Sequence, residues 1–279
     1  MSRLRSTSGW LVLATVTVVC ALVSFGCNSD DDSKGSSTTE ATEIIGEVPT
    51  EAGDPDATGE PEGEQELAEL PQLARAETDQ SIPEIRGSGE LTVNAWLETV
   101  VNDVATFWQQ TLNTAGKRFD PVNYEIFDTT HRTDCPGDRV VHVDKGPFYC
   151  TARSRIYLSS PYFQSFYGKI GDTAMAIPIA HEMGHHLQNM YGILDDLTIR
   201  SIDIELQADC LAGVWADSVS ERNLLEPGDI AEALQSRVAV ADPPGTSPND
   251  PQAHGTPEQR QGAFLAGLAG GRTAACVPQ

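Results

Sequence analysis

The chain has 279 residues, with 41 aspartates and glutamates against 18 lysines and arginines, which gives a formal net charge of -23 at pH 7. This balance argues against a nucleic-acid-binding protein, because such proteins need clustered lysine and arginine to neutralise phosphates. Residues 1–27 hold 2 basic and no acidic side chains, residues 28–90 hold 3 basic and 18 acidic, and residues 91–279 hold 13 basic and 23 acidic. Most of the acidic excess therefore precedes the last 189 residues, a length that suits one domain with a sizeable core.

The first 27 residues have the pattern of a secretory signal. Arg3 and Arg5 precede a 16-residue, largely apolar run, Trp10–Phe25, and the small residue Gly26 follows it. The run is shorter than the roughly 20 residues that span a membrane, so export is expected. Cys27 resembles the acylated cysteine of a bacterial lipoprotein, which predicts a lipid anchor; an ordinary cleaved signal and an uncleaved anchor are the alternatives.

Residues 28–90 are rich in Asp, Glu, Gly, Pro, Ser and Thr and contain few aromatic residues. Such a segment cannot bury enough apolar area to offset the entropy of ordering it. We expect a disordered, self-repelling spacer. The alternative is an acidic region that recruits a cationic partner.

From residue 91 onward the patterns predict an α+β domain. Apolar residues recur at spacings of three and four over 91–115, which indicates a helix. Short strand-like pieces follow at 124–127, 140–143 and 156–158, separated by turn residues. The remaining pattern is helical, with helices expected at 172–190, at 200–220, from about 229 and from 256. A helix, a small sheet and then helices is an α+β arrangement.

His181, Glu182 and His185 form an HExxH motif on the helix expected at 172–190. Positions four apart lie on one helix face, so both imidazoles can reach one metal ion, while Glu182 projects toward water on that ion. His186 projects from a different face and is assigned a structural role. Burying Glu182 in this strongly apolar stretch would be costly without metal and water.

A third metal ligand is expected because catalytic zinc takes three protein ligands and leaves the fourth position for water. Glu205 follows His185 by 20 residues and lies on the next expected helix. Asp209, one turn further, is placed to accept a hydrogen bond from a ligand imidazole and hold its tautomer. The plain alternative is that both carboxylates belong to a solvated helix face.

Four blocks of sequence together resemble the bacterial neutral zinc metallopeptidase family. They are GPFYC at 146–150, AHEMGHHLQN at 180–189, ELQADCLAGVWA at 205–216 and HGTPEQR at 254–260. The resemblance runs from about residue 91 to the C-terminus. It implies a zinc-dependent peptidase fold with one zinc ion, the three ligands above and Glu182 as general base. Pro178 departs from the family, which usually has a helix former there, and would kink a helix that has already begun.

The cysteines also bear on the compartment. With Cys20 and Cys27 set aside, an even number remains, which in an exported chain indicates two disulfides. The four are Cys135, Cys150, Cys210 and Cys276. The first two flank strand-like pieces, so a pairing between them is favoured, and the last two then pair by elimination. A role for Cys210 as a zinc ligand is discounted, because its position five residues after Glu205 points about 140° away around the helix.

These residues predict hydrolysis of a peptide bond in a peptide or protein substrate. Zinc would activate water, and Glu182 would take its proton and pass it to the leaving amine. His254 is the candidate donor to the oxyanion, with Tyr149 and Tyr157 as weaker candidates. The strand near Ile156 is expected to offer its edge to an extended substrate. The competing interpretation is an inactive, zinc-stabilised lipoprotein of the cell envelope that binds partners or acts as a chaperone.

Overall fold

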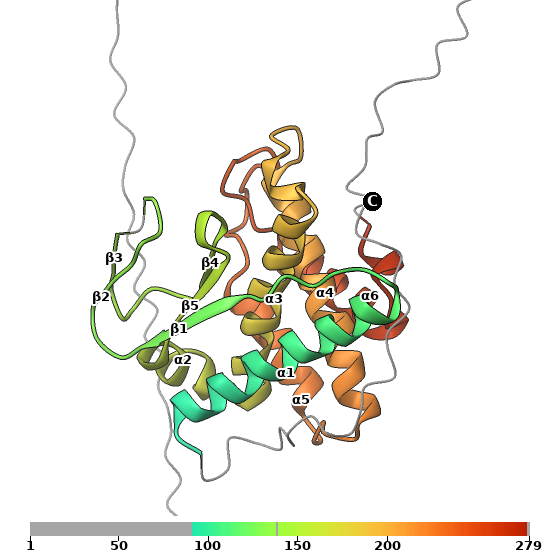
Figure 1. Cartoon of the computed structure of the whole chain (residues 1–279), viewed down its shortest axis with the longest axis horizontal. Helices are drawn as coiled ribbons and strands as arrows, with labels where there is room; N and C mark the ends of the chain where they lie inside the picture. The colour runs from blue at the N-terminus through green and yellow to red at the C-terminus, as the bar shows by residue number, and fades with distance from the viewer. Residues whose placement is uncertain (1–90, 138, 278–279) are drawn as a thin grey trace, which may run out of the picture. The chain divides into compact units, whose positions relative to one another are not determined.

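The computed structural model describes residues 91–137 and 139–277, which belong to one compact unit. The α+β class predicted from the sequence is confirmed: a long helix comes first, then a small mixed sheet, then a helical region (Figure 1). The proposed secretory signal, Cys27 and the acidic spacer lie outside the described residues. Among the residues described, no helix is both long and apolar enough to cross a membrane.

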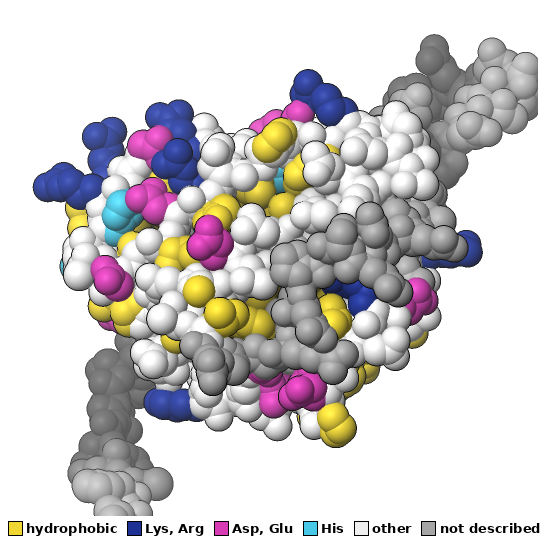
Figure 2. All heavy atoms as spheres, turned by 60° about the horizontal axis from the view of Figure 1, so that its bottom comes forward, with side chains coloured by type: hydrophobic (Ala, Val, Ile, Leu, Met, Phe, Trp, Pro, Cys, Tyr) yellow, Lys and Arg dark blue, Asp and Glu magenta, His cyan; other side chains and the backbone are white. Residues whose placement is uncertain are grey.

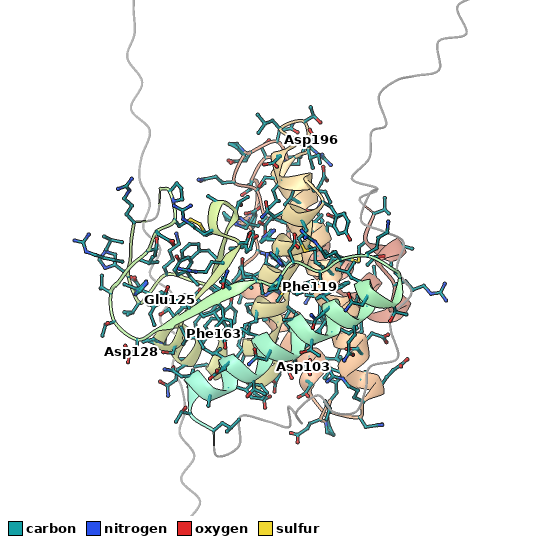
Figure 3. The ribbon with its side chains drawn as sticks, viewed as in Figure 1. Asp103, Phe119, Glu125, Asp128, Phe163 and Asp196 are labelled. Atoms are coloured by element: carbon teal, nitrogen blue, oxygen red, sulfur yellow. A yellow bond between two sulfur atoms is a disulfide. The ribbon has the colours of Figure 1, made fainter. Side chains whose placement is uncertain are left out.

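Helix α1 (Val93–Thr114) begins at Thr92, whose hydroxyl accepts a hydrogen bond from the Ala95 amide at 3.3 Å. Its apolar stripe is buried in the main core. Asp103 interrupts that stripe and is only 1% exposed (labelled in Figure 3). Its carboxylate accepts hydrogen bonds from Trp215 at 2.7 Å and from Arg222 at 2.9 Å, so it fastens α1 to helix α4 (Ser201–Glu221) and the residue after it.

The main sheet has three strands in the order β1–β5–β4. β1 (Asn123–Phe127) pairs in parallel with β5 (Arg155–Ser159), and β4 (Phe148–Cys150) pairs with β5 in antiparallel. β5 is therefore the central strand, and the expectation that the strand near Ile156 offers a free edge to a substrate is wrong. The edge strands are β1 and β4, and the sequence patterns did not predict β4.

The piece expected as a strand at 140–143 is shorter and lies outside the main sheet. Only Val140–Val141 forms a strand, β3, and it pairs in antiparallel with β2 (His131–Arg132). A short helix, α2 (Ser160–Ser165), follows β5 directly. Its first turn is capped by Ser159, whose hydroxyl accepts from the Tyr162 amide at 3.4 Å.

The helices of the second half follow the predicted ranges closely. They are α3 (Asp172–Met190), α4, α5 (Asp229–Ala239) and α6 (Pro257–Gly270), with a short 3-10 segment, η5 (Thr273–Cys276), at the end. Helix α6 opens with a capping box between Thr256 and Gln259. Pro178 lies inside α3, so the helix has already begun when it reaches the proline and lacks one backbone hydrogen bond there.

Helices α3 and α4 approach each other closely at Gly184. A Cβ placed on this glycine would lie 2.9 Å from the Cα of Ala208, closer than real side chains come to a backbone atom. The missing side chain therefore lets the HExxH helix lie directly against the helix that carries Glu205.

Two disulfides join the cysteines in the pairing that the sequence favoured. Cys135 bonds to Cys150 beside the sheet, and Cys210 bonds to Cys276, which ties α4 to η5. Disulfides of this kind persist in oxidising compartments, so they indicate a location outside the cytoplasm.

Candidate metal centre

Helices α3 and α4 bring His181, His185 and Glu205 together, with one ligand atom from each within 4.8 Å of the others. His181 Nε2 lies 3.1 Å from Glu205 Oε2, and His185 Nε2 lies 3.4 Å from Glu205 Oε1. The two imidazole rings stand nearly perpendicular, with centroids 4.7 Å apart. The stacking of positions four apart on a helix, expected from the sequence, produces this arrangement.

The donor atoms fit a zinc ion. Both Nε2 atoms face Glu205, and both Nδ1 atoms face other partners, so each imidazole can present the lone pair of one nitrogen to a metal. Glu205 Oε2 is buried and makes no properly aligned hydrogen bond within the described residues; His181 Nε2 lies 3.1 Å away and Arg260 Nη2 lies 3.7 Å away. A buried carboxylate oxygen without a hydrogen bond is costly unless a cation neutralises it. Two imidazoles and one carboxylate are the ligand set of many catalytic zinc sites.

Asp209 lies beside Nδ1 of His181. Its Oδ1 lies 2.8 Å from His181 Nδ1, and the carboxylate is fully buried. Two buried arginines also donate to it: Arg237 of α5 at 2.6 Å and Arg260 of α6 at 2.6 and 3.0 Å. Burial alone would raise the pKa of Asp209, but Arg260 and Arg237 outweigh that effect and hold it far below its usual range. The group is therefore a permanent carboxylate that orients His181.

His185 is held by Gln188, one turn further along α3, whose Oε1 lies 2.8 Å from His185 Nδ1. Burial alone would lower the pKa of His185, but the Glu205 carboxylate outweighs it and raises the pKa to about 9. Burial would likewise raise the pKa of Glu205, but His185 and His181 lower it well below its usual value. In the metal-free site Glu205 is thus ionised and attracts positive charge.

A cavity of about 310 Å³ opens onto these groups. Its walls come from the sheet, α3, α4 and the C-terminal region, and include Phe148, Pro178, Glu182, Val240 and His254. Glu182 is buried, yet its carboxylate makes no hydrogen bond or ion pair within the described part of the chain. It is therefore free to act on a molecule in the cavity.

His254 lines the same cavity and is half-exposed. Asp242 orients it: one carboxylate oxygen accepts from the backbone amides of His254 and Gly255 at 2.7 and 2.8 Å, and the other lies 3.4 Å from His254 Nδ1. The sequence placed His254 before a helix cap but gave no sign of this partner, because the two residues meet only through a loop.

The two tyrosines considered as oxyanion donors, Tyr149 and Tyr157, lie in different surroundings. Tyr157 is fully buried, donates to Asp134 at 2.8 Å and is not part of the cavity wall, so its candidacy is not supported. Tyr149 lines the cavity, but its hydroxyl hydrogen-bonds His186 Nδ1 at 3.1 Å and accepts from Asn189 at 2.8 Å.

His186 has the structural role expected for it. Its Nε2 lies 2.7 Å from the carbonyl oxygen of Asp120, so Nε2 donates and Nδ1 accepts from Tyr149. Burial lowers its pKa. The neutral imidazole thus joins α3 to the sheet and to the segment before β1.

Tyr167 is a cavity residue that the sequence analysis missed. It lies in the short segment between α2 and α3, and its side chain is almost fully buried. Across residues 91–137 and 139–277 its hydroxyl forms no hydrogen bond, and it lines the cavity that holds Glu182. Burial raises its pKa, so the hydroxyl keeps its proton and is a hydrogen-bond donor. No periodicity or motif marks it, because its role depends only on where the fold places it.

An HExxH helix packed on a helix that supplies a glutamate is the arrangement of the zinc peptidase class, with His181, His185 and Glu205 as the candidate metal site. A model of the family described as "Putative neutral zinc metallopeptidase" matches residues 64–278, and the chain belongs to this family.

Two uncharacterized bacterial proteins are similar to the chain. Uncharacterized protein YpfJ of Escherichia coli (strain K12) is 32% identical over 190 residues, which cover 61% of this chain and 65% of that protein. Uncharacterized protein Rv2575 of Mycobacterium tuberculosis is 33% identical over 158 residues, covering 47% and 54%. The similarity thus spans less than two thirds of each relative's length. No solved structure matches the chain.

Proposed function

We propose that this domain hydrolyses peptide bonds with one zinc ion held by His181, His185 and Glu205. The observation that supports this most directly is the buried ligand group beside an unengaged carboxylate, Glu182, in one open cavity. When bound, zinc supplies positive charge that polarises the scissile carbonyl and lowers the pKa of a water molecule toward neutrality. A site that only stabilised the fold would have no use for a base at this position.

The chain's own residues then divide the work. The Glu182 carboxylate removes the proton from the attacking water and returns it to the leaving amine. Asp209 and Gln188 keep the two imidazoles in the tautomer that faces the metal. Among the donors that line the cavity, His254 and Tyr167 are the candidates for stabilising the oxyanion.

An extended substrate would lie along β4. Phe148 and Tyr149 line the cavity, as do Gly146 and Pro147 just before the strand. β4 ends the sheet on this side, so its outer edge is available to pair with a peptide main chain. A structure with a peptide bound away from this strand would contradict the proposal.

We also propose that the domain works outside the cytoplasmic membrane, held by acylated Cys27 and an acidic spacer. The two disulfides support the compartment. Mass spectrometry of the mature N-terminus tests the anchor: a diacylglyceryl group on Cys27 supports it, and an unmodified new N-terminus contradicts it.

The hydrolytic function predicts a sharp effect of Glu182→Gln. This variant keeps the size of the side chain but removes the base, so we expect cleavage of an unfolded protein to fall by roughly 10² to 10⁴-fold. Zinc content, measured on the same samples, should stay at one ion per chain.

Two other results would redirect the conclusion. Equal cleavage by Glu182→Gln and wild type would refute the role of Glu182. Zinc-loaded wild type that cleaves nothing would favour the envelope-binding or chaperone-like alternative.

The oxyanion donors can be separated by single changes. Tyr167→Phe removes only the hydroxyl, and we expect kcat to fall by about 10² with little change in KM. Tyr191→Phe is the control, because Tyr191 also carries a hydroxyl but is not part of the cavity wall. If the two variants have equal kcat, Tyr167 is not the donor. A fall in kcat of about 10² in His254→Ala would then assign the role to His254.

A further inference from the structure

A continuous chain of hydrogen bonds leads from the candidate ligand His185 to the disulfide at η5. His185 Nδ1 lies 2.8 Å from Gln188 Oε1. Gln188 Nε2 donates to Gln207 Oε1 at 3.0 Å and to the Ile204 carbonyl at 2.8 Å. Gln207 Nε2 donates to the carbonyl of Cys276 at 3.2 Å. We call Gln188, Gln207 and the Cys276 carbonyl the amide chain.

The polarity of the amide chain is fixed by its main-chain ends. A carbonyl oxygen only accepts, so Gln207 must present its NH₂ group to Cys276 and its oxygen to Gln188. Gln188 must then donate to Gln207, and also to Ile204, which leaves its oxygen for His185. His185 therefore keeps a proton on Nδ1, and Nε2, which faces Glu205, is the nitrogen left to bind a metal ion.

Burial prevents these hydrogen-bond directions from reversing. Gln188 is 0% exposed and Gln207 is 2% exposed, so bulk water does not compete for these groups. Reversing either amide would place two donors or two acceptors face to face in the interior. Such a reversal leaves buried polar groups without partners.

The far end of the amide chain is held covalently. Cys276 lies in η5, and its sulfur bonds to Cys210 of α4, three residues after Gln207. This disulfide keeps the accepting carbonyl against the same helix that carries Gln207 and Glu205. The other disulfide, Cys135–Cys150, lies beside the sheet and belongs to a separate apolar cluster.

We propose that Gln188 and Gln207 are positioning residues for the metal centre and that the Cys210–Cys276 disulfide is their anchor. The amide chain preorganises His185 for zinc, so the disulfide sets metal affinity as well as fold stability. This inference rests on His185 being a ligand, which is part of the proposed function, but it does not require hydrolysis.

Zinc affinity of the full-length protein tests the proposal, measured by competition with a chelator dye of known affinity after the metal is stripped. Gln188→Met removes the acceptor for His185, and we expect zinc to bind roughly 10- to 100-fold more weakly. Gln207→Met removes the next link of the amide chain and should weaken zinc binding severalfold. Gln261→Met is the control, because Gln261 also donates to a main-chain carbonyl, that of Leu234 at 3.2 Å, away from the site.

The two disulfides provide a second, paired comparison. We expect the Cys210→Ala/Cys276→Ala protein to lose zinc affinity severalfold, and the Cys135→Ala/Cys150→Ala protein to bind zinc like the wild type. Absorption spectra with cobalt in place of zinc report the ligand geometry and should change only in the first protein. Circular dichroism shows which variants are folded and enter the comparison.

The outcomes distinguish the positioning role of the amide chain from the proposed hydrolysis. Wild-type zinc affinity in Gln188→Met, or equal losses in the two disulfide proteins, would overturn the amide chain as a positioning device. A wild-type protein that binds no zinc would overturn it together with the metal centre. A wild-type protein that binds zinc but cleaves nothing would remove the proposed hydrolysis and leave the positioning role standing.

Discussion

Asp209 joins more elements of the structure than any metal ligand does. From α4 it contacts His181 of α3, Arg237 of α5 and Arg260 of α6. All of these contacts are buried, so the charges depend on one another rather than on water. The carboxylate therefore serves the metal centre and the packing of four helices at once.

Asp209→Asn should be severely destabilising, since two buried arginines would lose their shared counter-charge. We expect a loss of about 3–5 kcal/mol in the free energy of unfolding, measured with urea. Asp203→Asn is the control: Asp203 pairs with Arg200, whose side chain is 48% exposed, and the change should cost about 0–1 kcal/mol. Similar losses in both variants would contradict the assigned role of Asp209.

The lowered pKa of Asp209 also fixes the sign of a pH effect. A carboxyl whose pKa is lower in the folded than in the unfolded state stabilises the fold above the unfolded pKa of about 3.9. This contribution is lost as the pH falls toward the folded-state value. Asp209→Asn should therefore flatten the loss of stability on acidification.

Metal binding should release a proton from His185. Its pKa is raised to about 9 in the metal-free site, so the imidazole is charged at pH 7.5 and must become neutral to bind zinc. Calorimetry of zinc binding in buffers of different ionisation enthalpy should show about one proton released from this group, a release that disappears as the pH rises above 9. In the metal-free protein the raised pKa stabilises the fold below about pH 6.5, and this is lost through pH 9. A proton count that does not change over that range would contradict this account.

At the level of single residues, the sequence predicted the metal-centre side chains whose spacing follows from helix geometry. His181, His185, Glu205 and Asp209 are four apart in pairs, so their faces could be predicted from the period alone. Arg237, Tyr167 and Gln207 could not be assigned roles in this way, because each reaches the site through tertiary packing between separate elements.

The close approach of α3 and α4 is the feature of the elements on which the site depends most. Gly184→Ala would place a methyl group 2.9 Å from the Cα of Ala208, so the helices must separate and Glu205 must move away from His181. We expect both Tm and zinc affinity to fall. Gly262→Ala on α6 is the matched control, because a Cβ there meets nothing within 4 Å and should stabilise the helix by about 0.5–1 kcal/mol. A Gly184→Ala protein that behaves like Gly262→Ala would show that α3 and α4 can accommodate the added methyl group without moving the metal ligands.

The helices and the two five-residue strands β1 and β5 were predictable, but the shorter strands and the order of the strands in the sheet were not, for a physical reason. A helix of 20 residues repeats its apolar period several times, so its range is evident, as for α3 and α4. β2, β3 and β4 have two or three residues each, too few for an alternation to appear. The central place of β5 follows from pairing with β1 and β4, which no local pattern encodes.

Seen as a whole, the described unit carries both signs of charge close together. Figure 2 shows lysine and arginine side chains gathered at one end of the face in view, with aspartate and glutamate among them. Among the described residues, Arg153 lies 3.2 Å from Asp134, and Arg155 lies 3.6 Å from Glu125. Charge on this surface is thus interleaved, and the chemistry that matters for function is inside the cavity.

The contacts that complete the metal centre come from late in the chain, and this sets an order of events. Asp209 and Arg260 are 51 residues apart, and Gln207 and Cys276 are 69 residues apart. A growing or translocating chain therefore presents the two histidines, Glu205 and Asp209 well before Arg260 and the Cys276 carbonyl, which contact Asp209 and Gln207, arrive. The centre can therefore be complete only after α6 and η5 have docked. For the hydrolysis proposed above, this means that a nascent chain would not yet hold its metal ligands in their final orientation.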